Sequence, residues 1–135
     1  MFGLRLLTAV AILSSAPGTT AQSGALYSCV DIQTARPVEI GITICNASPT
    51  EALAARLEDD NLQRRSGALI TDVSAGSLAQ IAGLAPGDVI YRVGGVDVED
   101  EVETSARLDQ IGEDSDTVVN FLRRGRPYRV KLRQR

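Results

Sequence analysis

The side chains of this chain that could do chemistry are carboxylates, hydroxyls, one lysine and two cysteines, because the sequence contains no histidine. Without histidine, neither a Ser-His-Asp or Cys-His triad nor the H-E-x-x-H zinc motif can form. A Ser-Lys pair would depend on Lys131, which falls in a predicted terminal strand. The acids between residues 97 and 116 occupy polar loop and helix-surface positions, which favours a solvated face over a catalytic pair. We therefore predict a non-enzymatic chain with no catalytic residue, no metal site and no cofactor.

The two cysteines matter because the chain begins like an exported protein. Residues 1–21 have the pattern of a secretory signal peptide, with Arg5 before an apolar run and small residues before Gln22. The apolar run is too short to span a bilayer. We expect export and cleavage, and the alternative is a short uncleaved anchor.

An oxidising compartment favours a disulfide between Cys29 and Cys45. Residues 26–32 and 38–45 could form an antiparallel pair that turns near Arg36 and Pro37, which would place the two cysteines opposite each other. Such a bridge would add up to ~3 kcal/mol of stability in the chain-entropy model. The alternative interpretation is two small buried apolar residues.

The strongest signals for secondary structure lie in a connector from residue 76 to residue 90. Ser77 and Gln80 have the spacing of a capping box at a helix start. Gly83 stands where that short helix must stop, since glycine adopts the left-handed conformation without a steric cost. Pro86-Gly87 fits a type II turn, and a β-branched run follows it. The connector is therefore built to place a strand.

The other predicted elements have ordinary helix and strand patterns. Apolar residues alternate with period two over residues 38–45, which indicates one strand with an apolar face. Ser48, Pro49 and Glu51 predict a helix over residues 49–59 with Ser48 as N-cap. The remaining expectations are a strand at 68–73, a turn at Gly94-Gly95, a helix at 101–111 with Val102, Ser105, Leu108 and Ile111 near one face, and strands at 117–122 and 127–132 around Arg124-Gly125.

The connector pattern G-S-x-A-x-x-A-G-L-x-x-G-D-x-I-x-x-V-x-G resembles the PDZ domains of bacterial envelope proteins. These include the PDZ domains of the high-temperature-requirement periplasmic serine proteases, whose separate catalytic domain has no counterpart here. The resemblance implies the α+β class and a PDZ-like, partly open β-barrel of five to six strands capped by two helices. It divides the chain into a signal peptide (1–21), an N-terminal extension (22–37) and a PDZ-like domain (38–134), and it implies the periplasm as the location.

The resemblance also implies a peptide-binding site. PDZ domains hold a partner's C-terminal carboxylate on the backbone N–H groups of a Φ-G-Φ loop, and the partner adds as a β-strand between the next strand and the second helix. The matching loop is Glu39 to Ile42, where Gly41 lets the backbone approach an anion closely. The implied peptide-binding residues are Ile40, Gly41, Ile42, Thr43, Ile44, Ser105 and Leu108.

Two departures from the family pattern leave a second interpretation open. Glu39 places a carboxylate beside a loop that would bind a carboxylate, and an unbroken strand over residues 38–45 would close the loop. In that case Ile40, Gly41 and Ile42 are simply part of a core strand.

Two functions follow from these alternatives. The first is an adaptor that binds protein C-termini or extended peptides by β-augmentation, with an envelope protease or a secretion component as candidate partner. The second is a structural interaction domain whose groove is blocked and which contacts partners through its C-terminal hairpin, since residues 123–135 hold seven basic residues and no acid.

The net charge of −3 argues against nucleic acid as a partner. We expect no membrane contact, although an anionic lipid is an alternative ligand of the basic hairpin.

Overall fold

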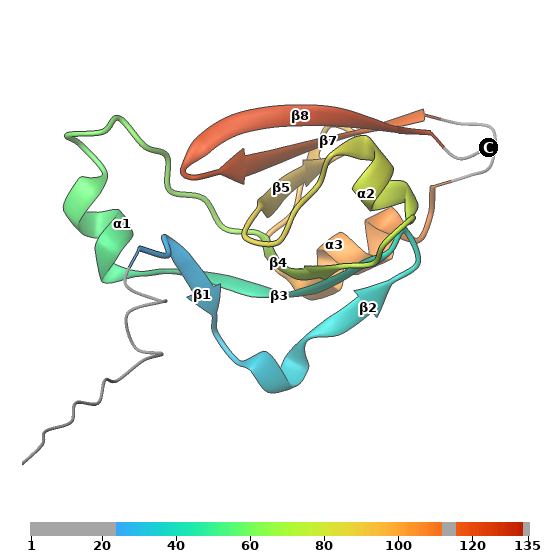
Figure 1. Cartoon of the computed structure of the whole chain (residues 1–135), viewed down its shortest axis with the longest axis horizontal. Coiled ribbons are helices and arrows are strands. Elements are labelled where there is room, and N and C mark those ends of the chain that lie inside the picture. The colour runs from blue at the N-terminus through green and yellow to red at the C-terminus, as the bar shows by residue number, and fades with distance from the viewer. Residues whose placement is uncertain (1–23, 112–115, 134–135) are drawn as a thin grey trace, which may run out of the picture.

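The structure is a computed structural model that describes residues 24–111 and 116–133 (Figure 1). The predicted signal peptide (residues 1–21) lies outside the described residues. The described elements are, in order, β1 (Tyr27–Cys29), the 3-10 helix η2 (Ile32–Thr34), β2 (Arg36–Val38), β3 (Ile42–Pro49), α1 (Glu51–Arg56), β4 (Ala68–Val73), α2 (Leu78–Ala82), β5 (Val89–Val93), β6 (Val96–Asp97), α3 (Glu101–Leu108), β7 (Asp116–Arg123) and β8 (Arg126–Arg133).

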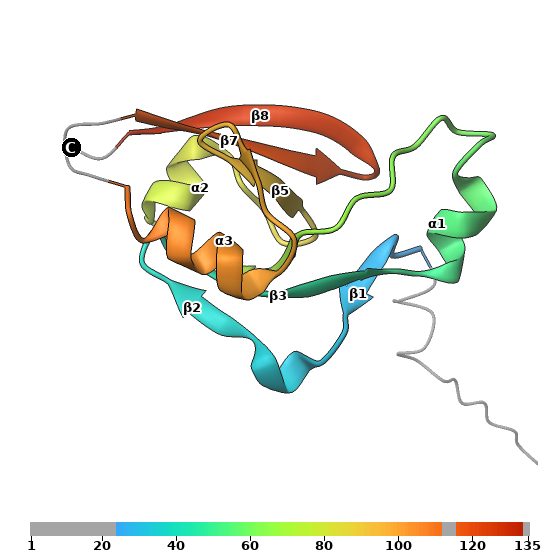
Figure 2. The same cartoon turned by 180° about the vertical axis from the view of Figure 1, so that it is seen from behind.

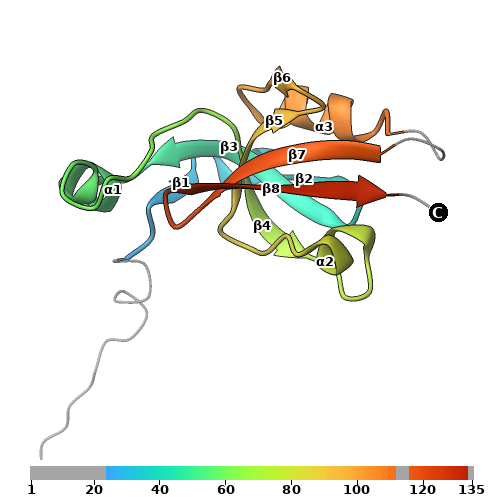
Figure 3. The same ribbon diagram turned by 90° about the horizontal axis from the view of Figure 1, so that it is seen from above.

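The strands form one open antiparallel sheet with the order β1-β3-β4-β5-β7-β8, in which β2 also pairs with β3 and β6 with β5. The predicted α+β class and the partly open sheet are confirmed. The sheet has eight strands within the described residues rather than five or six, because the N-terminal extension contributes β1 and most of β2. Figure 3 shows α2 and α3 on opposite sides of the strands and α1 apart from both. None of the helices that the structure describes is long and apolar enough to cross a membrane.

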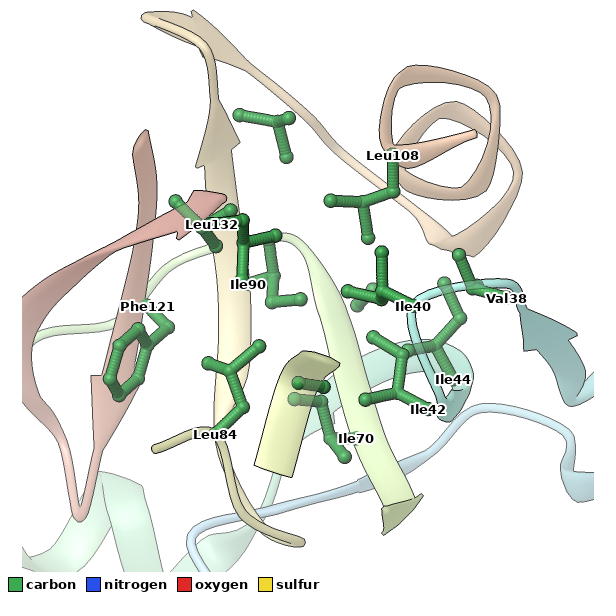
Figure 4. Close-up of a cluster of buried hydrophobic side chains, with 14 of the residues drawn as sticks. Val38, Ile40, Ile42, Ile44, Ile70, Leu84, Ile90, Leu108, Phe121 and Leu132 are labelled. Atoms are coloured by element: carbon green, nitrogen blue, oxygen red, sulfur yellow. The ribbon is translucent and has the colours of Figure 1, made fainter. Parts of the chain in front are cut away.

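Two groups of buried apolar side chains stabilise this arrangement. The larger group lies between the sheet, α2 and α3, and it includes Ile42, Ile90, Leu108 and Phe121 (Figure 4). The smaller group gathers near α1 and β1 around Leu53, and it includes Cys45 and Tyr27. The extension therefore packs as part of the fold, and its first buried residue is Leu26.

The connector adopts the predicted conformation. The Ser77 hydroxyl accepts from the Gln80 N–H at 3.1 Å, and the Gln80 side chain accepts from the Gly76 N–H at 2.7 Å. Gly83 caps α2 in the left-handed conformation. The Asp88 N–H donates to the Ala85 carbonyl across the predicted Pro86-Gly87 turn, and β5 begins at the next residue. Local turn chemistry is sufficient to explain this segment.

The first and third helices differ from their predictions in detail. Thr50 rather than Ser48 is the N-cap of α1, because β3 continues through Pro49. Helix α3 ends at Leu108, with Asp100 as its N-cap, and Val102 is exposed rather than on the buried face. The start of α1 is therefore set by the end of β3, and the start of α3 by the Asp100 cap.

Candidate peptide-binding groove

The structure brings most of the predicted site residues together. Ile40, Ile42, Ile44 and Leu108 are all buried in the larger apolar group. Figure 4 shows Leu108 extending from α3 toward Ile40, with Ile42 and Ile44 beside it. Apolar side chains therefore lie between β3 and α3, and these are the residue types that the resemblance implies for a peptide groove.

The loop before β3 is fixed by its contacts with α2. Gly41 has φ +104°, and a Cβ placed there would lie 2.1 Å from the Ser77 Cβ. The Ile40 carbonyl accepts from the Ala79 N–H at 3.0 Å, and the Gly41 carbonyl accepts from the Ser74 N–H at 2.8 Å. Gly41 is therefore required by the fold, because its conformation and its contact with Ser77 both exclude a side chain. A substitution at Gly41 tests folding as well as binding.

The Gly41 N–H already has an acceptor. It donates to the Val38 carbonyl at 2.9 Å, which closes a turn over residues 39–41. The residues from 38 to 45 are therefore not one unbroken strand, and that prediction was wrong. The turn near Arg36 and Pro37 was also predicted incorrectly, because those residues begin β2.

Strand β2 lies on the edge of β3 that faces away from β4. Its register places Arg36 opposite Ile44, Pro37 opposite Thr43 and Val38 opposite Ile42. The same part of β3 pairs with β4 through Ile42 and Ile44, so both of its edges carry a neighbouring strand. The strand position that β-augmentation would give to a partner is thus occupied by the chain's own residues (Figure 2).

Val38 is the residue of this site that sequence reasoning missed. Its side chain is 5% exposed and lies in the same apolar group as Ile40, Ile42 and Leu108. Figure 4 places it beside Ile40 and Ile44. The period-two pattern had assigned Val38 to the start of the β3 strand, and that pattern holds no signal for the turn that separates them.

Ser105 is the predicted polar contact from the helix. It is buried on α3, and its hydroxyl donates to an Asp109 carboxylate oxygen at 3.5 Å. Thr43 is partly buried, and its carbonyl accepts from the Thr71 hydroxyl at 3.2 Å. Both residues therefore have partners within the domain.

The predicted disulfide between Cys29 and Cys45 is present, with a Cα–Cα distance of 5.6 Å. In the β1–β3 register Cys29 is opposite Ala47, so the two cysteines are offset rather than directly opposite as we expected. The Val30 N–H donates to the Asn46 carbonyl at 2.9 Å just beyond the bridge. The bridge therefore fixes the end of β1 to the middle of β3.

Asp88, a buried carboxylate, forms an ion pair with Arg123 away from the predicted groove. Asp88 is 2% exposed and accepts from Arg123 through both carboxylate oxygens, at 2.9 and 2.7 Å. Arg123 also donates to the Gly83 carbonyl at 2.6 Å. The hydrogen bond to Asp88 raises the pKa of Arg123 above its already high ordinary value. This pair joins the connector to the β7–β8 hairpin and has a structural role.

The other basic residues of the C-terminal hairpin lie on the surface. Lys131 and Arg133 approach the Asp116 carboxylate at 4.0 and 3.5 Å, and all three side chains are exposed. Arg126 donates to the Asp60 carbonyl at 3.2 Å, and Arg129 is exposed. Strand β8 ends the sheet order, so the hairpin presents a basic edge.

Across residues 24–111 and 116–133 no cluster of acids and cysteines is suited to hold a metal ion.

Known proteins resemble part of this chain. Residues 69–123 match the PDZ domain family. A Synechocystis protein, HhoB, described as a serine protease, is 50% identical over 50 residues, which are 36% of this chain and 12% of the protease. The chain thus spans a small part of that relative.

Two solved structures have a similar fold at 19% sequence identity and a TM-score of 0.55. One is the HtrA-type protease AlgW with a decapeptide, where the match covers 76% of this chain and 30% of the protease. The other is the HtrA3 PDZ domain bound to a phage-derived ligand, FGRWV, where it covers 71% of this chain and 84% of that domain. At this identity the two structures support the fold.

Proposed function

We propose that this chain, in which residues 69–123 match the PDZ domain family, is a non-enzymatic, exported peptide-binding module. Its ligands are C-terminal or extended peptides of envelope proteins, and its role is that of an adaptor in the periplasm. The observation that carries the proposal is the pairing of β2 with β3 in the groove. An extended segment of this chain already adds antiparallel to β3, with an aliphatic side chain among Ile40, Ile42 and Leu108.

Other observations support parts of this proposal. The comparisons match a PDZ domain alone, and the sequence contains no histidine for a hydrolytic triad. The HtrA3 PDZ domain and AlgW were both solved with peptides, which makes peptides the first ligand class to test. The predicted signal peptide and the disulfide agree with an oxidising compartment.

A titration followed by amide NMR tests the proposal. Peptides with a free C-terminus and an aliphatic last residue are added to the labelled chain, and amidated copies of the same peptides serve as controls. We expect micromolar binding, with shifts confined to residues 40–46 and α3, and weaker binding of the amidated copies. If no free-acid peptide from a diverse C-terminal library shifts these amides, the proposal is wrong.

The second candidate is an interaction domain with a closed groove that binds through the β7–β8 hairpin. The exposed basic residues at the β8 edge favour it, since they present positive charge that an acidic partner could neutralise. The same NMR experiment separates the two functions, because an acidic partner would shift the amides of residues 126–133 and leave β3 unchanged. Charge reversal at Arg126 and Arg129 would then abolish binding.

A further inference from the structure

Residues 30–38, which we call the flap, lie where a bound peptide would lie. We propose that the flap is an internal ligand of the groove, and that a partner peptide must displace β2 in order to bind. This inference rests on the proposed peptide-binding function and adds its regulation. It is carried by three observations: the pairing of β2, the position of Val38 and the exposure of the other flap residues apart from the partly buried Ala35.

The flap has the geometry of a peptide that has added to β3. It runs antiparallel to β3, with Arg36 opposite Ile44 and Val38 opposite Ile42. Val38 is the last residue before the loop, and its carbonyl accepts from the Gly41 N–H at 2.9 Å. The resemblance assigns the N–H groups of this loop to the terminal carboxylate of a partner. The Val38 carbonyl therefore uses a donor that a partner's last residue would need.

The side chain of Val38 occupies the apolar end of the groove. It is packed with Ile40, Ile42 and Leu108. A partner's terminal side chain has to enter this same space, and we expect it to be aliphatic because Ile40, Ile42 and Leu108 are aliphatic. Because Val38 fills this space, a small branched residue such as valine would fit it best.

The flap is held much less firmly than the rest of the sheet. Val30 is 61% exposed and Ile32 is 59% exposed, and Arg36 and Pro37 are also exposed. Val38 is its one buried side chain, so few apolar contacts are lost if β2 leaves. Segments of this kind open locally at a lower free energy than the core. Pro37 has no backbone N–H, which weakens β2 as a template for a further strand.

Both ends of the flap stay attached when it opens. The Cys29–Cys45 bridge and the buried Tyr27 hold its N-terminal end, and the contacts of Gly41 with α2 hold its C-terminal end. A short tether of this kind keeps the internal segment at an effective concentration on the order of millimolar. The apparent affinity for an external peptide is therefore reduced by the fraction of molecules in which the groove is open.

The experiment compares two valine substitutions in the same flap. Val38→Ser weakens the internal ligand, and Val30→Ser is the matched control because Val30 is exposed. The probe is a fluorescent heptapeptide with the sequence of residues 32–38 (IQTARPV) and a free C-terminus, titrated by polarisation into each purified chain. We expect Val38→Ser to bind it at least about tenfold more tightly than the wild type, while Val30→Ser matches the wild type. Equal affinities in all three chains would overturn the inference.

Native-state hydrogen exchange on the wild type gives a second, independent measurement. We expect the amides that join β2 and β3 to exchange at least about tenfold faster than those that join β3 and β4, through an opening that does not unfold the domain. If both sets exchange only by global unfolding, the flap is a fixed strand and the inference is wrong, whether or not Val38→Ser folds.

The two measurements also separate this inference from the proposed function. Tight binding of the heptapeptide to the wild type, at the affinity of Val38→Ser, would support the proposed function and refute the internal ligand. Local opening of the flap without binding of the heptapeptide or any library peptide, even to Val38→Ser, would leave the flap as a mobile strand and refute peptide binding.

Discussion

The connector from residue 76 to residue 90 and the flap from residue 30 to residue 38 both lead the chain into the sheet, but they are held differently. The connector is fixed by a capped helix, a left-handed glycine and the ion pair of the buried Asp88 with Arg123. The flap buries one side chain, Val38, and pairs with one strand. The loop before β3 is therefore supported by a firmly held segment, while the strand that occupies the groove is attached through few buried contacts.

This difference matches the roles that we propose for the two segments. A binding site needs a lining that keeps its shape while the ligand changes, because ordering the site on binding would reduce affinity. Here α2 supports the loop before β3 through Ile40 and Gly41, and the flap contributes the displaceable part.

Gly41 is the point where the two segments meet, so its substitution has the largest expected effect. Gly41→Ala forces a side chain into the left-handed conformation and onto Ser77, which we expect to lower the free energy of unfolding by about 4 kcal/mol. Gly76→Ala is the matched control, because Gly76 has a positive φ with open space around it, and it should cost about 1 kcal/mol. Chemical denaturation measures both. Equal losses would show that the contact with Ser77 relaxes easily.

The second prediction concerns the anchor of the connector. Asp88→Ala leaves Arg123 without its buried partner, so we expect a loss of about 3 kcal/mol in the free energy of unfolding. The control is Asp97→Ala, which removes an exposed ion pair with Arg92 and should change stability by less than about 1 kcal/mol. Denaturant titration of the three chains is the measurement. A loss at Asp88 no larger than that at Asp97 would remove the basis for calling the connector firmly held.

The third prediction concerns the fixed end of the flap. Replacing both Cys29 and Cys45 by alanine opens a loop with a sequence separation of 16, and we expect a loss of about 2–3 kcal/mol from the chain-entropy term. The wild type under reducing conditions should show a similar loss. An unchanged unfolding midpoint in both cases would mean that burial of β1 alone holds this end.

The smallest effect concerns Tyr27, the buried residue beside that end. Its hydroxyl donates to the Gln63 carbonyl at 3.2 Å and accepts from the Arg65 N–H at 3.1 Å. Burial raises the pKa of the Tyr27 phenol, and the Arg65 hydrogen bond and the nearby arginines offset this in part. The stability that Tyr27 contributes is therefore complete below the ordinary tyrosine pKa of about 10 and is lost as the pH rises above it.

Tyr27→Phe tests this assignment. We expect it to cost about 1 kcal/mol at neutral pH, from the lost hydrogen bonds. It should also flatten the fall in stability above pH ~10 relative to the wild type. Tyr128→Phe, at an exposed position, is the control and should change neither quantity. A pH profile of Tyr27→Phe as steep as that of the wild type would contradict the assignment.

Segments whose conformation depends on local chemistry were predictable from the sequence. Gly83, the Pro86-Gly87 turn and the Gly94-Gly95 and Arg124-Gly125 hairpins all appear where the pattern predicted them. Each depends on a positive φ or a fixed proline φ, which neighbouring residues set with little help from distant contacts. The pairing of Cys29 with Cys45 was also predictable, because the described chain offers no competing cysteine.

The strand that occupies the groove could not be predicted from the sequence and is seen only in the tertiary structure. Val38, Ile40, Ile42 and Ile44 are buried at every second position, and the same pattern fits one straight strand or two strands joined by a turn. A period-two pattern indicates which side chains face the core, but it does not indicate which strand pairs with the segment that carries it. The turn over residues 39–41 is closed locally by the Gly41 N–H and the Val38 carbonyl, and Gly41 also packs against Ser77, more than thirty residues away in the sequence. The pairing of β2 with β3 beyond this turn is a tertiary contact that the period-two pattern does not specify.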